Sequence, residues 1–401
     1  MKNLLGKTVF LLLTFFMFAT ISAQMKESRT TYAAEAVKPF LDSGLLPGII
    51  NIFSKGNIQE TACCGWAHVD QKIPIRMDQL FMQCSQTKGF CGVTIAILVE
   101  EGKLSLDDPI SKYLPEFKNL KVAIKGKDGK KKIVPAKNVP TIRMAMNHTA
   151  GFIMEIPQKL NKGWPSVSLR ESARIVSGIP LLFEPGTKFS YANTGVDVAA
   201  AVTEVVTGKK WDVFLKERVL DPLGMKDSSF NPTDEQLSRV ISLYETPPGK
   251  KAIYKRCHSI MPLPHNGPNI HPSAGAGLWT TTNDQLKFYR MLMNLGLGDN
   301  GVRILKEETV KNLLATSTRP AGMEKYSLGF AVGSNGEFGH GGAWGSKCTV
   351  NWKTKQLELR VVQVTQGYAR PWEPALKKAA EKFFSAPLDS SASDAYTGRM
   401  K

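Results

Sequence analysis

The sequence predicts an α+β fold in which one antiparallel sheet is assembled from both ends of the chain. Helices flank this sheet, and a mostly helical domain is inserted between its two halves. Two observations predict this arrangement: stretches with strand character lie near both ends, and a long middle part has helical periodicity. The strand stretches are 48–53, 60–69, 326–332, 336–340, 346–352 and 357–366. Strands that follow one another across short turns, with the helices grouped elsewhere, favour an antiparallel sheet.

The helices are predicted from apolar spacing and from their end signals. Residues 32–43 form the first helix, which Gly44 ends, and a second helix runs from Ser85 to about residue 98. Further helical segments are 141–150, 168–175, 193–206, 211–219, 283–295 and 371–384. Residues 121–140 are rich in lysine and glycine and are interpreted as a solvated hairpin or loop, with a functional basic patch as the alternative. One domain is therefore expected over 28–385, with a sheet part at 28–80 and 275–385 and a helical part at 81–274.

The two chain ends are expected to lie outside this domain. Residues 1–23 have the pattern of an export signal, with Lys2 and Lys7 before an apolar stretch and small residues before Gln24. The apolar stretch is too short for a secure membrane span. We therefore expect an exported protein, periplasmic or secreted, with no stable membrane anchor after cleavage of the signal. Residues 386–401 are small and polar, which predicts a disordered tail.

The composition argues against nucleic-acid binding and against a metal cofactor. Lys plus Arg is 52 and Asp plus Glu is 35, a formal net charge of +17 that suits anionic surfaces in general. The basic residues are scattered apart from 125–132, and that run has no interleaved aromatic residues on which bases could stack. The six cysteines show no zinc-ligand spacing and are interpreted as buried thiols. Three histidines, His258, His265 and His271, lie in the irregular stretch 245–274, where a surface loop is favoured over a metal site.

The stretch with the clearest chemical content is Ser85-Gln86-Thr87-Lys88. On a helix, this spacing places the serine hydroxyl and the lysine amine on one face, one turn apart. A serine in the first turn also lies near free backbone N–H groups that favour a developing anion, and a lysine can act as its base. The tetrapeptide alone is a weak signal, because a helix-capping serine beside a solvent-facing lysine has the same pattern. Cys84 is a further candidate nucleophile, one residue away from the lysine face.

Two later stretches are expected to meet Ser85. Tyr191 follows a Pro-Gly turn at the head of a helix, where the Lys88 ammonium would lower the phenol pKa; a half-buried packing tyrosine is the alternative. His340 lies among glycines on a strand, where the missing side chains would let a substrate lie along the strand edge. The backbone N–H groups of Ser85 and Ala343 would then stabilise an oxyanion. A bulged edge strand is the alternative for this stretch, and His148 is interpreted as a structural, hydrogen-bonding residue.

Together these stretches resemble the serine beta-lactamase-like family, which includes class C beta-lactamases, D-amino-acid peptidases and carboxylesterases. The landmarks occur in the family's order over about residues 35–385: Ser85-x-x-Lys88, Leu104 to Pro109, Thr141 to Gly151, Pro185 to Asn193, Pro222 to Met225, Gly275 to Asp284, and His340-Gly341-Gly342. The resemblance implies that Ser85 is acylated, that Lys88 helps to deprotonate it and that Tyr191 relays protons. It also implies that Asn193 binds substrate or holds Lys88. The strand residues His340, Gly341, Gly342 and Ala343 would bind substrate.

One departure from the family pattern bears on the substrate. Beta-lactamases and penicillin-binding members usually carry Lys-Thr-Gly where this chain has His340-Gly341-Gly342, and that lysine helps to hold a substrate carboxylate. We therefore expect an exported serine hydrolase that needs no cofactor and acts on a small-molecule or short-peptide ester or amide. A carboxylesterase or D-amino-acid peptidase is favoured over an efficient beta-lactamase. The alternative is a catalytically idle relative that binds peptidoglycan or peptide ligands.

Overall fold

The computed structural model describes residues 26–27, 31–126, 129–157, 160, 167–245, 255–256, 269–315, 325–365 and 370–387. The predicted export signal, residues 388–401 of the predicted tail, and Cys257, His258 and His265 lie outside the described residues.

The main sheet is built from both ends of the chain, and it confirms the predicted α+β class. Its strand order is β1-β3-β2-β14-β13-β12-β11, and all pairs along this order are antiparallel except β1 with β3. The strands are β1 (Lys26–Glu27), β2 (Gly48–Lys55), β3 (Ile58–His68), β11 (Ala331–Val332), β12 (Glu337–Gly341), β13 (Lys347–Asn351) and β14 (Gln356–Val361), and the short β4 (Ile73–Pro74) pairs with β3. The two chain ends meet where β2 pairs with β14, with Ile52 opposite Leu359.

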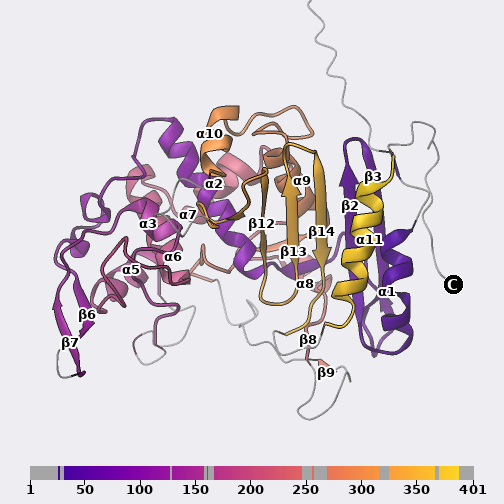
Figure 1. Cartoon of the computed structure of the whole chain (residues 1–401), viewed down its shortest axis with the longest axis horizontal. Helices are drawn as coiled ribbons and strands as arrows, with labels where there is room; N and C mark the ends of the chain where they lie inside the picture. Colours follow the sequence, from indigo (N-terminus) through magenta and orange to yellow (C-terminus); the bar gives the residue numbers. More distant parts are fainter. Residues whose placement is uncertain are drawn as a thin grey trace, which may run out of the picture.

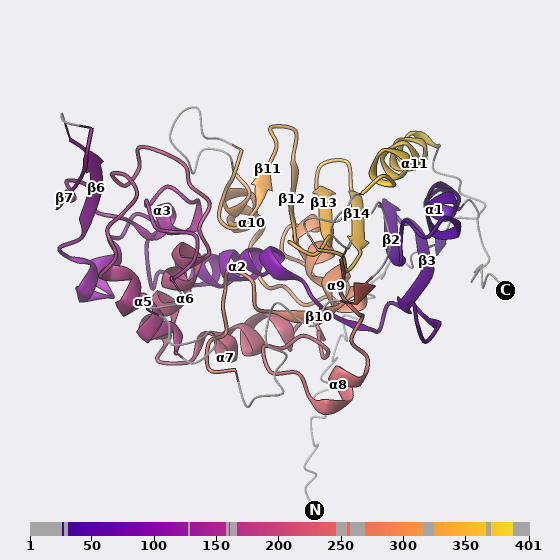
Figure 2. The same ribbon diagram turned by 90° about the horizontal axis from the view of Figure 1, so that it is seen from below.

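Helices cover both faces of the sheet because side chains alternate along each strand. On β2, Phe53 packs in a core with α1 (Tyr32–Asp42) and α11 (Glu373–Ser385), which lie side by side in Figure 1. The neighbouring Ile52 belongs to the larger core on the other face. That core includes Phe90 of α2 (Thr87–Glu100) stacked on Phe288 of α9 (Thr282–Met293), with ring centroids 3.7 Å apart. The helix that carries Lys88 is thus held between the sheet and the helical region (Figure 2).

The remaining elements lie outside the main sheet. They are β5 (Leu80–Met82) paired with β10 (Trp279–Thr281), the β6 (Lys121–Lys125) and β7 (Lys131–Pro135) hairpin, α3 (Ile142–Met146), α5 (Leu169–Ser177), α6 (Asn193–Thr207), α7 (Trp211–Leu215) with the π-helix Lys216–Leu220, α8 (Asp234–Ser238), β8 (Tyr244–Glu245) paired with β9 (Lys255–Arg256), and α10 (Glu307–Leu313). Three 3₁₀ turns lie at Cys84–Gln86, Ile110–Lys112 and Pro115–Phe117.

Three predicted elements are clearly shorter than expected, and one of them is the strand 357–366, which ends at Val361. The predicted strand 326–332 forms a sheet strand only at Ala331–Val332, because the chain before it packs on α2. There Gly92 makes room for the Leu328 carbonyl, and Gly329 approaches the Lys88 carbonyl so closely that an added Cβ would lie 2.3 Å from it. The predicted helix 141–150 ends at Met146, since His148 has a φ of 64° and turns the chain.

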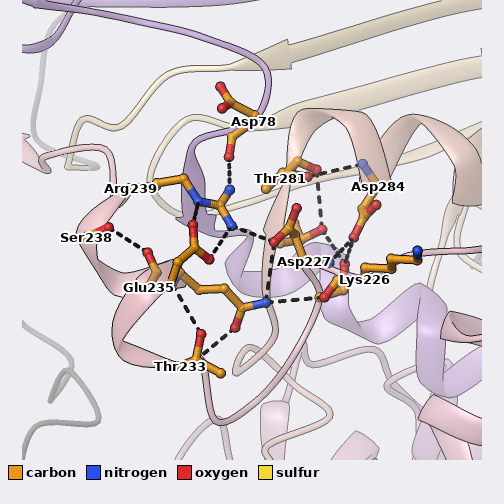
Figure 3. Close-up of polar contacts among 12 residues, drawn as sticks. Asp78, Lys226, Asp227, Thr233, Glu235, Ser238, Arg239, Thr281 and Asp284 are labelled. Atoms are coloured by element: carbon orange, nitrogen blue, oxygen red, sulfur yellow. Dashed lines mark hydrogen bonds and ion pairs between the residues drawn. The ribbon is translucent and has the colours of Figure 1, made fainter.

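An ion-pair network fixes the segment that leads into the Ser85 turn (Figure 3). Arg239, after α8, donates to Asp227 at 2.6 Å, to Glu235 at 2.7 Å and to the backbone carbonyl of Asp78. Asp227 also contacts α9, because its backbone N–H donates to the carboxylate of Asp284 at 2.8 Å. The Arg239 carbonyl also accepts from Leu80 N at 2.9 Å. The network therefore connects α8, α9 and β5.

Among the described residues, no helix has both the length and the apolar character needed to cross a bilayer. The described cysteines are not joined to one another by disulfides. Cys84, Cys91 and Cys348 are buried as predicted, but Cys63 is exposed and Cys64 is only partly buried, so the prediction of buried thiols is wrong for these two strand residues.

Candidate active site

Ser85 lies in the 3₁₀ turn Cys84–Gln86, between β5 and α2. The turn is tight: Cys84 has a φ of 51°, a region that non-glycine residues rarely adopt. Hydrogen bonds hold it from both sides, from Thr87 Oγ1 to the Cys84 carbonyl at 2.7 Å and from Leu278 N to Thr87 Oγ1 at 3.2 Å. The local geometry therefore presents Ser85, half-buried, directly ahead of a buried helix.

Lys88 is one turn further on and is fully buried. Its Nζ lies 3.2 Å from Ser85 Oγ, 2.5 Å from Asn193 Oδ1 and 2.6 Å from the Gly275 carbonyl. The alternative of a solvent-facing lysine is therefore wrong. A neutral amine has two N–H groups and one lone pair. Because Asn193 and Gly275 can only accept at these positions, they take the two N–H groups and direct the lone pair of neutral Lys88 at Ser85.

The surroundings of Lys88 favour this neutral form near physiological pH. Burial lowers the pKa of the Lys88 ammonium to about 7, against the opposing effect of the carboxylates of Asp197 and Glu155. A base whose pKa is close to the working pH is suited to accept a proton from a serine hydroxyl.

Tyr191 lies immediately before α6, and its ring covers the Lys88 ammonium, with Nζ 4.6 Å from the ring centroid. Its hydroxyl lies 3.4 Å from His340 Nε2. The expected lowering of the Tyr191 pKa is not found: burial raises the pKa of the phenol, with an opposing effect of its hydrogen bond to Ser85. Tyr191 is therefore a phenol at neutral pH, and Lys88 is the better base of the two.

His340 holds a defined tautomer at the end of β12. Its Nδ1 lies 2.7 Å from the Gly341 carbonyl, which can only accept, so the ring proton is at Nδ1 and Nε2 is an acceptor. The hydroxyls of Tyr191, at 3.4 Å, and of Tyr326, at 3.0 Å, both face that Nε2. Burial and, next, the positive charge of Lys88 lower the pKa of His340 to about 3. The ring is neutral throughout the physiological range.

The glycine-rich stretch after His340 lies against the Ser85 turn. An added Cβ on Gly342 would be 2.5 Å from the Gln83 carbonyl and 2.4 Å from Ser346 Oγ, so only glycine fits there. Ala343 packs against the cluster that contains Cys84, and the described pairing between β11 and β12 stops at Gly339. Gly341 still pairs with Lys347 of β13, but neither His340 nor Gly341 pairs with a described residue of β11, which leaves room for a substrate along that side of the strand.

Cys84 is a poor nucleophile in this setting. It is 2% exposed, and burial raises the pKa of its thiol to about 12, although the backbone N–H groups of Trp344 and Ala343 oppose this. The thiol is therefore protonated at neutral pH.

Behind Lys88, two carboxylates that the sequence reasoning missed complete the site. The Asn193 amide donates from Nδ2 to Glu155 while its Oδ1 accepts from Lys88, so Glu155 fixes which end of the amide faces the lysine. Asp197, one turn along α6, accepts from Gly275 N at 3.0 Å and from Ser273 Oγ at 3.1 Å, and thereby holds the Gly275 carbonyl in place. The position of Asp197, four residues after Asn193 on the same predicted helix, could have indicated that it lies near the site. No pattern in the sequence indicated this for Glu155.

His148 and His271 form hydrogen bonds that hold neighbouring segments together. His148 Nδ1 accepts from Ala192 N at 3.2 Å, and its ring packs between those of Tyr191 and Tyr326, at 4.3 and 4.6 Å between centroids. This agrees with the interpretation of His148 as a structural residue. His271 is buried and lies 3.4 Å from Asp197, with its other ring nitrogen 3.0 Å from the Val167 carbonyl.

Comparison with known proteins places the chain among related folds. The family model "Beta-lactamase" matches residues 33–381. Protein Rv1367c from Mycobacterium tuberculosis is 27% identical over 283 residues, which is 69% of each chain. The structure of EstCE1, described as a hydrolase with promiscuous acyltransferase activity, has a TM-score of 0.71 at 21% identity and covers 87% of this chain and 97% of its own. The LovD6 mutant of simvastatin synthase from Aspergillus terreus has a TM-score of 0.70 at 18% identity, over 87% and 95%.

The sheet and the helices have the arrangement of these neighbours, and the family match extends over most of the chain. The chain therefore belongs to the Beta-lactamase family and is a serine hydrolase.

Proposed function

We propose that this protein hydrolyses neutral esters or amides through an acyl-enzyme on Ser85. The observation that carries the proposal is the fixed, fully buried amine of Lys88, whose two N–H groups are occupied and whose third position faces Ser85 Oγ at 3.2 Å. Lys88 takes the Ser85 proton as the oxygen attacks the acyl carbon. Tyr191, as a phenol, donates its proton to the leaving group and is reprotonated from Lys88.

The acyl-enzyme is then hydrolysed by the reverse use of the same groups. Water attacks the acyl carbon while the Lys88–Tyr191 pair takes its proton, and Ser85 leaves as the hydroxyl. The N–H groups of Ser85 and Ala343 are assigned to the oxyanion in both steps. No metal or other cofactor is required by this scheme.

The environment of His340 supports a neutral substrate. Where carboxylate-binding relatives would carry a lysine, the neutral His340 ring presents an acceptor nitrogen toward two tyrosine hydroxyls. A charge-assisted hydrogen bond contributes about 1.5 to 3 kcal/mol, so its absence should weaken carboxylate binding about ten- to a hundredfold. The binding of neutral short-chain esters does not depend on a carboxylate and should be unaffected. The description of EstCE1 as a hydrolase with promiscuous acyltransferase activity is consistent with ester chemistry in this fold.

The export pattern at residues 1–23 adds that the enzyme works in the periplasm or outside the cell. Cleavage at the predicted point would be detected as a mature N-terminus at Gln24 in fractionated cells. A chain that keeps residues 1–23 and remains in the cytoplasm would contradict this part of the proposal.

A fluorescent serine-reactive phosphonate tests the nucleophile. The protein should be labelled and should hydrolyse p-nitrophenyl esters, whereas Ser85→Ala should do neither and should melt at nearly the same temperature. Unlabelled, inactive wild-type protein would favour the idle ligand-binding alternative, and full activity in Ser85→Ala would refute the assignment of Ser85.

A panel of esters, D-amino-acid peptides and beta-lactams tests the substrate class. We expect ester hydrolysis and poor beta-lactam hydrolysis, with His340→Lys shifting preference toward carboxylate-bearing substrates. Efficient cephalosporin turnover without ester hydrolysis would prove this assignment wrong.

A further inference from the structure

The β6–β7 hairpin is a separate structural feature that the hydrolase site does not use. Figures 1 and 2 show it at the end of the molecule opposite α1 and α11. Its base is attached by backbone hydrogen bonds between Ala123 N and the Leu181 carbonyl, at 2.9 Å, and between Leu181 N and the Lys121 carbonyl, at 2.8 Å. Val122 is buried at this base. The rest of the hairpin extends away from the helical region.

One face of the hairpin combines positive charge with an apolar centre. Directly paired residues of antiparallel strands share a face, which here carries the pairs Lys121–Pro135, Ala123–Ile133 and Lys125–Lys131. The lysines and Pro135 are exposed, and Ile133 is 54% exposed. We call these six residues the hairpin face.

The charges on the hairpin face are not compensated within the described part of the chain. Its lysines form no ion pair there, and Lys125 lies directly opposite Lys131. Like charges directly opposite each other on paired strands are unfavourable. In the surrounding sequence, 118–137, Asp128 is the only acidic residue. The hairpin thus keeps a repulsive arrangement that an anionic partner would relieve.

A cavity of about 330 Å³ adjoins the hairpin face at its base. Its lining includes Phe117, Val139, Lys118 and, from the hairpin face, Lys121 and Pro135. Val139 is 49% exposed. The combination of an apolar lining with two lysines repeats the chemistry of the hairpin face, and the shared residues make the two surfaces continuous.

We propose that the hairpin face and the adjoining cavity dock the protein on a bilayer of anionic phospholipid. The lysines contact lipid phosphates, and Ile133 and Val139 enter the boundary between headgroups and acyl chains. A nucleic acid would also attract the lysines, but it would leave Ile133 against a hydrated backbone, and the hairpin face has no aromatic side chain for base stacking. Exposed apolar side chains within a basic surface fit the interface of a membrane better.

Vesicle co-sedimentation tests this proposal, with vesicles of phosphatidylcholine alone or mixed with phosphatidylglycerol. The full chain and a chain that begins at Gln24, which retains every described residue, are both measured, because the apolar stretch at 8–20 binds lipid by itself. We expect the Gln24 chain to bind only the anionic vesicles. Each lysine near such a surface contributes about fivefold, so Lys125→Gln with Lys131→Gln should lower the partition coefficient about thirtyfold.

Two further variants separate local docking from the overall positive charge. Lys377→Gln with Lys378→Gln, on exposed positions of α11 at the opposite end of the molecule, removes the same charge and should change binding by less than threefold. Ile133→Ser should lower binding several-fold and leave its salt dependence unchanged. Equal losses in the two lysine pairs, or undiminished binding in the hairpin variants, would overturn the proposal. The proposal would also be overturned, in favour of a polymer partner, if the protein bound a soluble acidic polymer, lost that binding in the hairpin variants and did not bind vesicles.

Discussion

Glu155→Gln offers the sharpest test of how the site sets the proton affinity of Lys88. The carboxylate of Glu155 accepts from Asn193 Nδ2, and Asn193 Oδ1 accepts from Lys88 Nζ at 2.5 Å. A glutamine can still accept from Asn193, so this variant removes the negative charge and retains the orientation of the amide.

The expected shift follows from the separation of the charges. Two hydrogen bonds and the width of one amide separate the carboxylate from the ammonium by about 6 to 7 Å. At an effective dielectric constant of about 20, two unit charges at that separation interact by about 2.5 kcal/mol, close to two pKa units. Because Glu155 is exposed to solvent, water screens a large part of this interaction, and we expect a shift of roughly half to one pH unit.

The sign of the shift is fixed by the charges. Glu155 favours the ammonium form of Lys88, so its neutralisation lowers the pKa of Lys88 further below its present value of about 7. The reactive neutral amine then persists at lower pH. The acid limb of the kcat/KM profile for a p-nitrophenyl ester, read at the isosbestic wavelength of the product, should therefore move to lower pH.

Two companion variants make the result interpretable. Glu337→Gln removes an exposed carboxylate at the far end of β12 and should leave the acid limb in place. Glu155→Leu removes the acceptor as well, so that the Asn193 amide can reverse and donate to the lone pair of Lys88, and kcat/KM should fall at every pH. An acid limb that stays in place or moves to higher pH in Glu155→Gln would refute the electrostatic role of Glu155.

Three further predictions concern neighbouring parts of the molecule. Lys88→Ala and Tyr191→Phe should each lower kcat about a hundredfold or more. The loss of kcat in the double variant should be much smaller than the product of the two single losses, because residues that act as a unit are non-additive, and a loss equal to that product would contradict a shared proton. Gly342→Ala should lower kcat at least about tenfold, because the added Cβ displaces the strand from Ser85. Gly341→Ala is the control, since its Cβ would meet only the Ser346 carbonyl at 3.8 Å, and equal kinetics in the two variants would refute the packing argument. Arg239→Met should lower the free energy of unfolding in urea by about 2 to 3 kcal/mol by leaving its acceptors unpaired, and an unchanged midpoint would show that the network contributes nothing.

The fold class and the pairing of Ser85 with Lys88 could both be predicted from the sequence. The strand stretches at both ends had alternating or β-branched patterns, and their pairing into one sheet follows from those patterns and from the helical middle. The one-turn relation of Ser85 and Lys88 is a property of helix geometry, which is local and does not depend on the rest of the chain. Interactions between residues a few positions apart can be predicted in this way.

The tertiary structure decided the protonation states, because they depend on groups that are distant in sequence. Lys88 has a lowered pKa because α6 and the Gly275 segment surround it and exclude water, and Tyr191 has a raised pKa for the same reason. Proximity to an ammonium suggested the opposite direction for Tyr191, since a sequence shows which charges are present but not how deeply they are buried. Glu155 and Tyr326 reach the site only through the fold, from a loop and from the segment before β11. No spacing rule connects them to Ser85. Only the packing of distant segments places Glu155 against Asn193 and Tyr326 against His340.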